Sequence, residues 1–363
     1  MTQVLIVSAD LKKVTKQFST IASLYPTTQI TVSDLSPEHV IRCSLVVVDL
    51  QGIAPNQVEL LRRFLKSNPQ LSKLSIVDLK NRKEVLQAQE IGIFTLIDRR
   101  EKLPALILKI REILGNYSRP VLEANIPEKT VKSVWSTCSA LDTLSIAAVT
   151  EDPLPVPTLV RTANDITKAI ETDGLDNWLS AVHCHHSHTF CHTMLVAGHA
   201  VSLSKELGKP EEFQILLGLG ALVHDLGKVK IPLSILDKPG KLTEQERELI
   251  DKHPIYSKEI LKGRKEVPKE VIEMAVWHHE LLDGSGYPDG LKADQISQTV
   301  RILTISDIYS ALTEKRAYKD SYSPRQAFAI MFGMGGKLDK ELLRVFRNKI
   351  LTPDLGHLKR SAF

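Results

Sequence analysis

Five short runs of β-branched and other apolar residues recur in residues 1–115, and their spacing limits the possible folds more than any other feature. Between them lie longer segments with apolar residues at helical spacing, such as 57–66 and 82–89, and a further such segment, 103–114, follows the last run. Such alternation is typical of buried parallel strands joined by helices. The runs are Val4–Val7, Gln29–Val32, Leu45–Val48, Leu74–Val77 and Phe94–Ile97. The pattern predicts an α/β domain with a doubly wound, five-stranded parallel sheet and a ligand crevice at the carboxyl ends of its strands.

Asp10 and Asp49 follow two of the predicted strands, so we expect both to face this crevice. The segment Val46–Leu50 resembles the strand of response-regulator receiver domains that ends in the phosphoaccepting aspartate. By this resemblance Asp49 is the candidate phosphoacceptor of a two-component signalling module.

The residues that assist phosphoryl transfer in receivers are only partly present. Segment 8–10 supplies one carboxylate instead of an acidic pair, segment 77–79 supplies no hydroxyl group, and segment 97–99 has an acid and an arginine near the lysine position. Magnesium binding and phosphoryl transfer depend on such groups. We therefore favour a degenerate receiver-like docking or dimerisation module, in which Asp49 only ends a strand, over phosphorylation of Asp49.

The pattern changes after residue 115. Residues 116–157 contain several prolines without a sustained period and predict a connector, although Thr130–Val149 has enough apolar residues to pack as a helix or strand. Helical spacing dominates residues 158–363, which predicts an all-α helical bundle. The predicted helices are Leu159–Glu171, Leu175–Val182, Thr189–Leu207, Glu211–Leu222, Glu244–His253, Lys269–Glu280, Val300–Leu312 and Arg325–Met331.

The composition limits the cellular compartment and the classes of partner that we expect for this protein. The 363 residues are 43% hydrophobic and carry a formal charge of +4, which is typical of globular domains and too small to favour DNA or RNA as a partner. The four cysteines lack metal-knuckle or disulfide spacing, so we expect a reducing cytoplasm. The amino terminus does not resemble a secretory signal, and the apolar run 215–223 is too short to cross a membrane.

Ten of the twelve histidines fall within one segment of the second half. They are His183, His185, His186, His188, His192, His199, His224, His253, His278 and His279. Neutral imidazole is the commonest metal ligand, and a site for two ions needs about six donors. His188 and His192 lie one helical turn apart, and the adjacent pair His224-Asp225 adds a carboxylate that can bridge two ions. The sequence therefore predicts a binuclear metal site among several helices.

A series of motifs carries a more specific resemblance. The motifs are His224-Asp225 with Gly227-Lys228, His253, His278-His279-Glu280, Asp283-Gly284-Ser285-Gly286-Tyr287-Pro288 and Asp307. In this order they resemble the HD-GYP family of cyclic dinucleotide phosphodiesterases, a branch of the HD hydrolase superfamily.

The resemblance implies a ligand set. His192, His224, Asp225 and Asp307 would hold one ion, and Asp225, His253, His278 and His279 would hold the second. The ions would be iron or manganese, which nitrogen and oxygen donors suit. Some family members have a glutamate one turn before the first histidine ligand, which supports a third ion; His188 stands there in this chain. Because imidazole offers one lone pair and no charge, we expect two ions, with His188 as an additional candidate ligand. His185 and His186 lie one turn earlier and are expected to be solvated rather than to substitute for it.

The expected reaction is hydrolysis of cyclic di-GMP to linear pGpG, with GMP as a further product to be tested. Two ions would generate a bridging hydroxide that attacks phosphorus. Asp225 and Lys228 are the catalytic candidates, with Lys228 holding phosphate oxygens. The resemblance further implies substrate contacts from Tyr287, Arg316 and Lys319.

Two other interpretations are compatible with the same residues. A cyclic GMP-AMP phosphodiesterase would use the same metal chemistry, and a signalling adaptor would bind nucleotide with little turnover. The partners that we expect are the cyclic dinucleotide and a GGDEF-type synthase or another signalling protein, with a homodimer as a further expectation.

Overall fold

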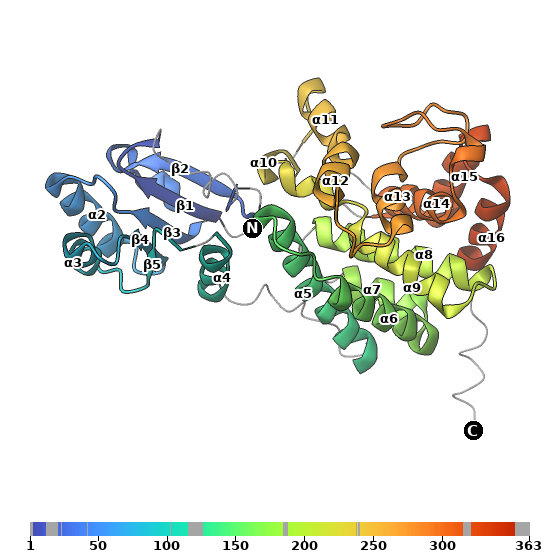
Figure 1. Ribbon diagram of the computed structural model, residues 1–363, viewed down its shortest axis with the longest axis horizontal. Coiled ribbons are helices and arrows are strands. Elements are labelled where there is room, and N and C mark those ends of the chain that lie inside the picture. Colours follow the sequence, from blue (N-terminus) through green and yellow to red (C-terminus); the bar gives the residue numbers. More distant parts are fainter. Residues whose placement is uncertain are drawn as a thin grey trace. The chain divides into compact units, whose positions relative to one another are not determined.

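A computed structural model describes residues 3–11, 21–22, 24–41, 43–101, 103–114, 126–183, 188–236, 238, 240–314 and 321–352 (Figure 1). Contacts between Cα atoms divide the chain into two compact units. The first unit comprises residues 1–119 and 229–238, and the second comprises 120–228 and 239–363. The boundaries expected from the sequence, 1–115, 116–157 and 158–363, stay predictions.

The first unit contains a five-stranded sheet whose strands are all parallel, as the sequence predicted (Figure 1). The strands are β1 (Gln3–Ser8), β2 (Thr27–Thr31), β3 (Cys43–Asp49), β4 (Ser72–Val77) and β5 (Leu96–Asp98). Their order is β2-β1-β3-β4-β5, so the direction of winding changes once, beside β1. Val4–Val7 and Leu45–Val48 are buried, which explains their uniformly apolar sequences.

Three α-helices within residues 1–119 have clear boundaries in the part of the chain that the structure describes. They are α2 (Pro55–Ser67), α3 (Arg82–Glu90) and α4 (Leu103–Ile113). Val58, Leu61 and Leu65 of α2 belong to the same buried cluster as residues of β1 and β3. The doubly wound arrangement, with helices on both faces, stays a prediction.

The predicted strand Phe94–Ile97 was wrong at its start. Phe94 is 79% exposed, and β5 begins only at Leu96, which pairs with Ser75 of β4. Similarly, Val32 lies beyond β2, in the short 3-10 helix η2 (Val32–Asp34). Strand ends depend on pairing with a neighbour, which apolar runs do not encode.

The second unit is helical, in agreement with the prediction (Figure 1). Its longer helices are α5 (Glu128–Thr150), α6 (Val156–Asp173), α7 (Leu175–His183), α8 (His188–Glu206), α9 (Glu211–Val223), α11 (Glu244–Asp251), α12 (His253–Leu261), α13 (Lys269–Trp277), α14 (Gln298–Thr313), α15 (Pro324–Gly333) and α16 (Lys340–Leu351). Shorter elements are η4 (Leu226–Lys230), α10 (Leu233–Leu236), η5 (Ala293–Gln295) and η6 (Gly335–Lys337). Residues 229–230 of η4 and all of α10 group with the first unit.

Helix α5 occupies most of the predicted connector, 116–157, and packs against α6, α7 and α8. The apolar residues of Thr130–Val149 therefore do form a packed helix. At the centre of the second unit, α9 contacts α6, α8 and α13, and its last turns are buried from Leu217 to Val223. The apolar carboxyl end of α9 thus delivers the next residues, His224 and Asp225, into the interior.

Two helix boundaries differ from the prediction. The predicted helix Glu244–His253 is divided, because α11 ends at Asp251 and α12 begins at His253, with Pro254 in its first turn. The predicted helix Lys269–Glu280 ends at Trp277. No helix in the described ranges is both long and apolar enough to span a membrane.

Candidate metal centre

The seven predicted ligands come from five helices or their ends. His192 lies in α8, His224 and Asp225 follow α9, and Asp307 lies in α14. His253 begins α12, whereas His278 and His279 follow α13. Helix α14 contacts α8, α9 and α13, and α12 contacts α13, so the fold brings these positions together.

One group of donors consists of His192, His224 and Asp307. One ligand atom from each lies within 4.8 Å of the others, and all three side chains are buried. His192 Nε2 is 2.9 Å from Asp307 Oδ1. The geometry therefore offers two nitrogens and an oxygen to a single ion.

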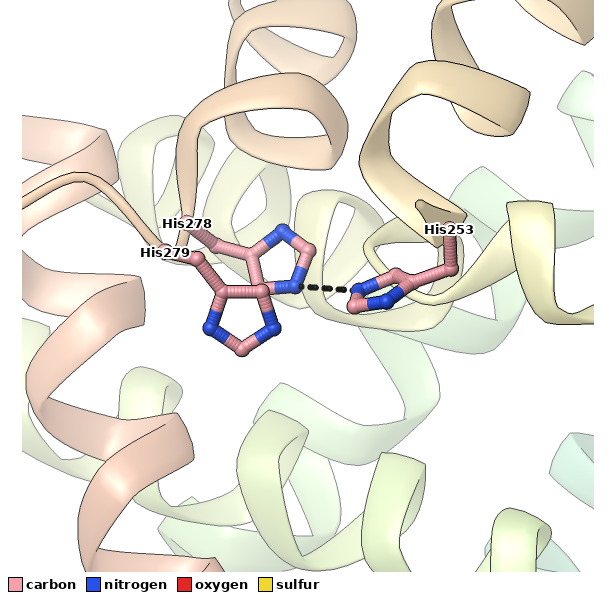
Figure 2. Close-up of side chains that lie close together, drawn as sticks. All are labelled: His253, His278 and His279. Carbon is pink, nitrogen blue, oxygen red and sulfur yellow. Dashed lines mark hydrogen bonds between the residues drawn. The ribbon is translucent and has the colours of Figure 1, made fainter. Parts of the chain in front are cut away.

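A second group consists of His253, His278 and His279, whose rings face one another in Figure 2. The Nε2 atoms of His253 and His278 are 3.1 Å apart, and a dashed line joins these two residues in Figure 2. Nδ1 of His253 lies 2.8 Å from the Ile250 carbonyl oxygen, and Nδ1 of His278 lies 3.1 Å from that of Met274.

These Nδ1 contacts decide what the two facing nitrogens can do. A carbonyl only accepts, so each Nδ1 carries the proton, and neutral rings then present bare lone pairs at Nε2. A hydrogen bond between the two Nε2 atoms would leave one Nδ1 lone pair against a carbonyl oxygen. A cation between the two Nε2 lone pairs allows both Nδ1 atoms to keep their protons. The donors of this group therefore fit a metal ion.

His224 is held in the same way. Its Nδ1 lies 2.6 Å from the Ala221 carbonyl oxygen, and its buried Nε2 has no hydrogen-bond partner among the described residues. That Nε2 instead lies 3.3 Å from Asp225 Oδ2. Backbone carbonyls thus orient three of the candidate ligand rings.

Two aspartates connect the groups. Asp225 Oδ2 faces His224, while Asp225 Oδ1 is 3.3 Å from His253 Nε2 and 3.9 Å from His278 Nε2. Asp307 Oδ1 contacts His192, and its Oδ2 is 3.8 Å from His279 Nδ1. Each carboxylate therefore presents one oxygen to each group, an arrangement suited to two neighbouring ions.

Burial and charge set the protonation of the site. Burial lowers the pKa of His253 and of His279 to about 3, although the nearby aspartates act in the opposite direction. Burial also holds the pKa of His278 well below its ordinary value. These rings are therefore neutral at neutral pH and can bind a cation.

At the two aspartates and at His192, neighbouring side chains outweigh the effect of burial on the pKa. Burial acts to raise the pKa of Asp225 and of Asp307, but the neighbouring histidines, with Lys228 beside Asp225, outweigh it and hold both pKa values below the usual range. Burial acts to lower the pKa of His192, but the nearby carboxylates of Asp307 and Glu314 outweigh this effect and raise the pKa to about 9. An ion at His192 would therefore displace a proton.

Lys228 lies beside the bridging carboxylate. Its Nζ is 2.5 Å from Asp225 Oδ2, and its side chain is 23% exposed. The short helix η4 carries Lys228 one turn beyond His224. The ammonium group thus contacts Asp225 inside the site and is also partly accessible to solvent.

The loop after α13 packs over His279. The Tyr287 ring stacks on the His279 ring with centroids 4.8 Å apart, and the Tyr287 N–H donates to the His279 carbonyl oxygen. The buried Glu280 carboxylate accepts from the backbone N–H groups of Asp289, Gly290 and Leu291. Glu280 therefore anchors the loop that carries Tyr287.

Other predicted residues have different outcomes. Arg316 and Lys319 lie outside the described residues, as do the side chain of His188 and all of His185 and His186.

Asp49 ends β3 and is buried, with its Oδ1 2.8 Å from Arg99 Nη2. Arg99 also contacts Glu84 of α3 at 3.0 Å. The predicted phosphoacceptor position is thus engaged by an internal arginine.

Sequence reasoning missed Glu314 near the first group. Its buried carboxylate lies 3.6 Å from His192 Nδ1. The only signal was its position, because Glu314 follows Asp307 by seven residues, about two helical turns, just after the end of α14.

Comparison with known proteins gives this site a context. Residues 178–342 match the family model described as an HD domain. All seven candidate ligands lie within this HD-domain match. Since it spans less than half of the chain, it assigns no family to the remaining residues.

Two relatives share this part of the chain. A cyclic di-GMP phosphodiesterase from Pseudomonas aeruginosa is 34% identical over 173 residues, which are 48% of this chain and 42% of that protein. The 3'3'-cGAMP-specific phosphodiesterase 1 from Vibrio cholerae is 41% identical over 162 residues, 43% of this chain and 37% of that protein. The matches thus span less than half the length of these relatives.

A solved structure shows a similar fold. Bd1817, an HDG"Y"P protein from Bdellovibrio bacteriovorus, aligns with a TM-score of 0.51 and 18% identity, over 68% of this chain and 81% of that one. At this identity the likeness concerns the fold alone.

Proposed function

We propose that the second unit is a metal-dependent phosphodiesterase that hydrolyses cyclic di-GMP to linear pGpG. The observation that carries the proposal is the pair of donor groups joined by both oxygens of Asp225 and Asp307. The HD-domain match and the phosphodiesterase relatives support the same reaction class.

In this proposal His192, His224, Asp225 and Asp307 hold one ion, and Asp225, His253, His278 and His279 hold the other. The all-nitrogen and oxygen donor set suits iron or manganese. When bound, such ions would lower the pKa of a coordinated water molecule and neutralise charge on phosphate oxygens. Carbonyl-oriented rings keep the donors fixed, so little reorganisation accompanies binding.

The protein's own groups would orient the substrate. Lys228 can turn its partly exposed ammonium group from Asp225 to a non-bridging phosphate oxygen, where it stabilises negative charge in the transition state. Tyr287 borders the site through its stacking on His279 and is the candidate base contact. Arg316 and Lys319 remain predicted contacts to the second phosphate.

The test is hydrolysis by purified protein loaded anaerobically with Fe²⁺ or Mn²⁺, with products identified by chromatography. We expect pGpG from cyclic di-GMP, with any GMP appearing later. His224→Ala should abolish turnover, whereas His39→Ala, an equal truncation in the first unit, should not. Absence of product with either metal, unchanged by His224→Ala, would refute the proposal.

A second candidate substrate is 3'3'-cGAMP, because one relative is named as specific for it. The metal ligands fix phosphodiester chemistry and not the bases, so parallel assays with both cyclic dinucleotides decide between them. A nucleotide-binding adaptor would give a binding isotherm without product. The GGDEF-type partner, the homodimer and the cytoplasmic setting stay predictions.

A further inference from the structure

Glu314 contacts the candidate ligand His192 and is not itself one of the candidate metal ligands. It follows the last residue of α14, and its side chain is 1% exposed. Its Oε2 is 3.6 Å from His192 Nδ1, whereas His192 Nε2 is 2.9 Å from Asp307 Oδ1 on the other edge of the ring. The His192 ring therefore lies between two buried carboxylates.

His192 differs in this respect from three other candidate ligands. Nδ1 of His224, His253 and His278 faces a backbone carbonyl oxygen at 2.6, 2.8 and 3.1 Å. Nδ1 of His192 is buried and has no partner within hydrogen-bond distance in the described residues. The carboxylate of Glu314 is thus placed where the other rings have a carbonyl oxygen.

The chemistry of metal-binding histidine gives this placement a consequence. A ring that binds an ion through Nε2 carries its proton on Nδ1, and an acceptor there fixes the ring orientation and increases its basicity. A carboxylate does so more strongly than a carbonyl, because the hydrogen bond is charge-assisted. It also adds negative charge near the cations without using a coordination position.

We propose that Glu314 is a positioning residue, which acts through His192 to strengthen binding of the ion in the first group. The inference rests on the proposed metal-dependent function. In the metal-bound protein the Nδ1–H of His192 donates to Glu314, so that Nε2 points toward the ion. The negative charge of Glu314 adds to those of Asp225 and Asp307 in balancing two divalent cations.

The test compares metal affinities of the full-length chain by Mn²⁺ titration against a fluorescent chelator, which reports the number of ions and each affinity. Glu314→Gln keeps the size and one acceptor oxygen but loses the charge. We expect one of the two ions to bind roughly 10- to 100-fold more weakly, the usual cost of removing such a partner. Glu314→Asp, which keeps the charge, should lose less.

Two controls separate this proposal from the proposed function. Glu206→Gln makes the same change at an exposed position of α8 and should bind both ions as the unmodified protein does. His192→Ala should weaken the same ion as Glu314→Gln. If the unmodified protein binds no Mn²⁺, the proposed metal site itself is wrong.

The results that overturn the role of Glu314 alone are also defined. If the unmodified protein binds two ions and His192→Ala weakens one, but Glu314→Gln retains full affinity for both, the proposal is wrong. It is equally wrong if Glu314→Gln and Glu314→Asp weaken both ions alike and lower the melting temperature of the metal-free protein. That pattern would indicate a structural role only.

Discussion

At position 227 the candidate site requires a residue without a side chain. A Cβ atom there would lie 1.9 Å from the His253 carbonyl oxygen and 2.6 Å from the Ser257 backbone nitrogen. The Gly227 N–H also donates to Ser257 Oγ at 2.8 Å. Close approach of these backbones sets the start of α12, and therefore the position of His253, relative to Asp225.

Gly227→Ala should consequently destabilise the protein and weaken metal binding. Displacing α12 from η4 is expected to cost roughly 1 to 3 kcal/mol, as overpacking of an interior does. Denaturant unfolding and metal content measure the two effects. Gly333→Ala is the control, because a Cβ at the end of α15 meets nothing within 4 Å. Equal behaviour of the two variants would show that the close approach is unimportant.

The identity of individual site residues was more predictable than their contacts. The seven ligand candidates could be named because the motifs occur in one order along the chain. The pairing of Asp49 with Arg99, and of His192 with Glu314, could not, because each joins residues that are distant in sequence. Such pairs depend on how strands and helices pack, which local spacing does not encode.

At the scale of elements, the loop after α13 depends on one side chain of the preceding segment. The Glu280 carboxylate accepts hydrogen bonds from three consecutive backbone N–H groups at 2.7 to 3.0 Å. Within the loop, Gly286 packs closely against the segment that precedes it, where a Cβ would be 2.4 Å from the Leu281 nitrogen. The motif therefore builds a fixed platform for Tyr287.

Glu280→Gln should loosen this platform while leaving the ligands in place. The amide offers one acceptor oxygen instead of two, and it turns N–H groups toward N–H groups. We expect faster hydrogen exchange in residues 287–292 and a higher KM with little change in metal content. Glu270→Gln, on the exposed face of α13, should change none of these. A lower metal content with unchanged exchange would contradict the anchoring role.

Arg99 joins three elements of the first unit, since it follows β5 and contacts Asp49 of β3 and Glu84 of α3. Arg99→Ala would leave two mostly buried carboxylates without this cation, at a cost of about 3 kcal/mol. Hydrogen exchange of the β3 and β4 amides measures the loss. Arg63→Ala, which removes an exposed ion pair, should cost under about 1 kcal/mol.

The same contact bears on phosphorylation. Because Arg99 Nη2 engages Asp49 Oδ1, we expect beryllofluoride not to label Asp49 in the unmodified protein. Labelling detected by fluorine resonance would show instead that the first unit is a working phosphoacceptor.

At the scale of the whole molecule, the pattern of periods predicted a parallel sheet followed by helices, and both are present. Periodicity succeeds here because the spacing of apolar residues differs between buried strands and amphipathic helices, and this difference is visible within a few residues. It fails where the assignment of a segment to a unit depends on contacts between residues far apart in the sequence. Residues 229–238, which cluster with the first unit, are an example. Helix α16 was also missed, although Asp339 caps its first turn.

The three tryptophans allow the second unit to be followed separately, because Trp135, Trp178 and Trp277 all belong to it. Metal ions that join five helices should stabilise this unit. At a free Mn²⁺ concentration of 100 times Kd, one ion contributes about 2.7 kcal/mol. For a unit of this size we expect the fluorescence-detected melting temperature to rise by roughly 5 to 10 °C, and a chelator to reverse the rise.

Asp225→Asn tests whether this stabilisation comes from the proposed centre. The substitution keeps the shape of the side chain but removes the charge and one of the two oxygens that face the donor groups. Its melting temperature should therefore respond little to Mn²⁺. An equal rise in Asp225→Asn would mean that the stabilising ions bind elsewhere, and that the carboxylate does not bridge two ions.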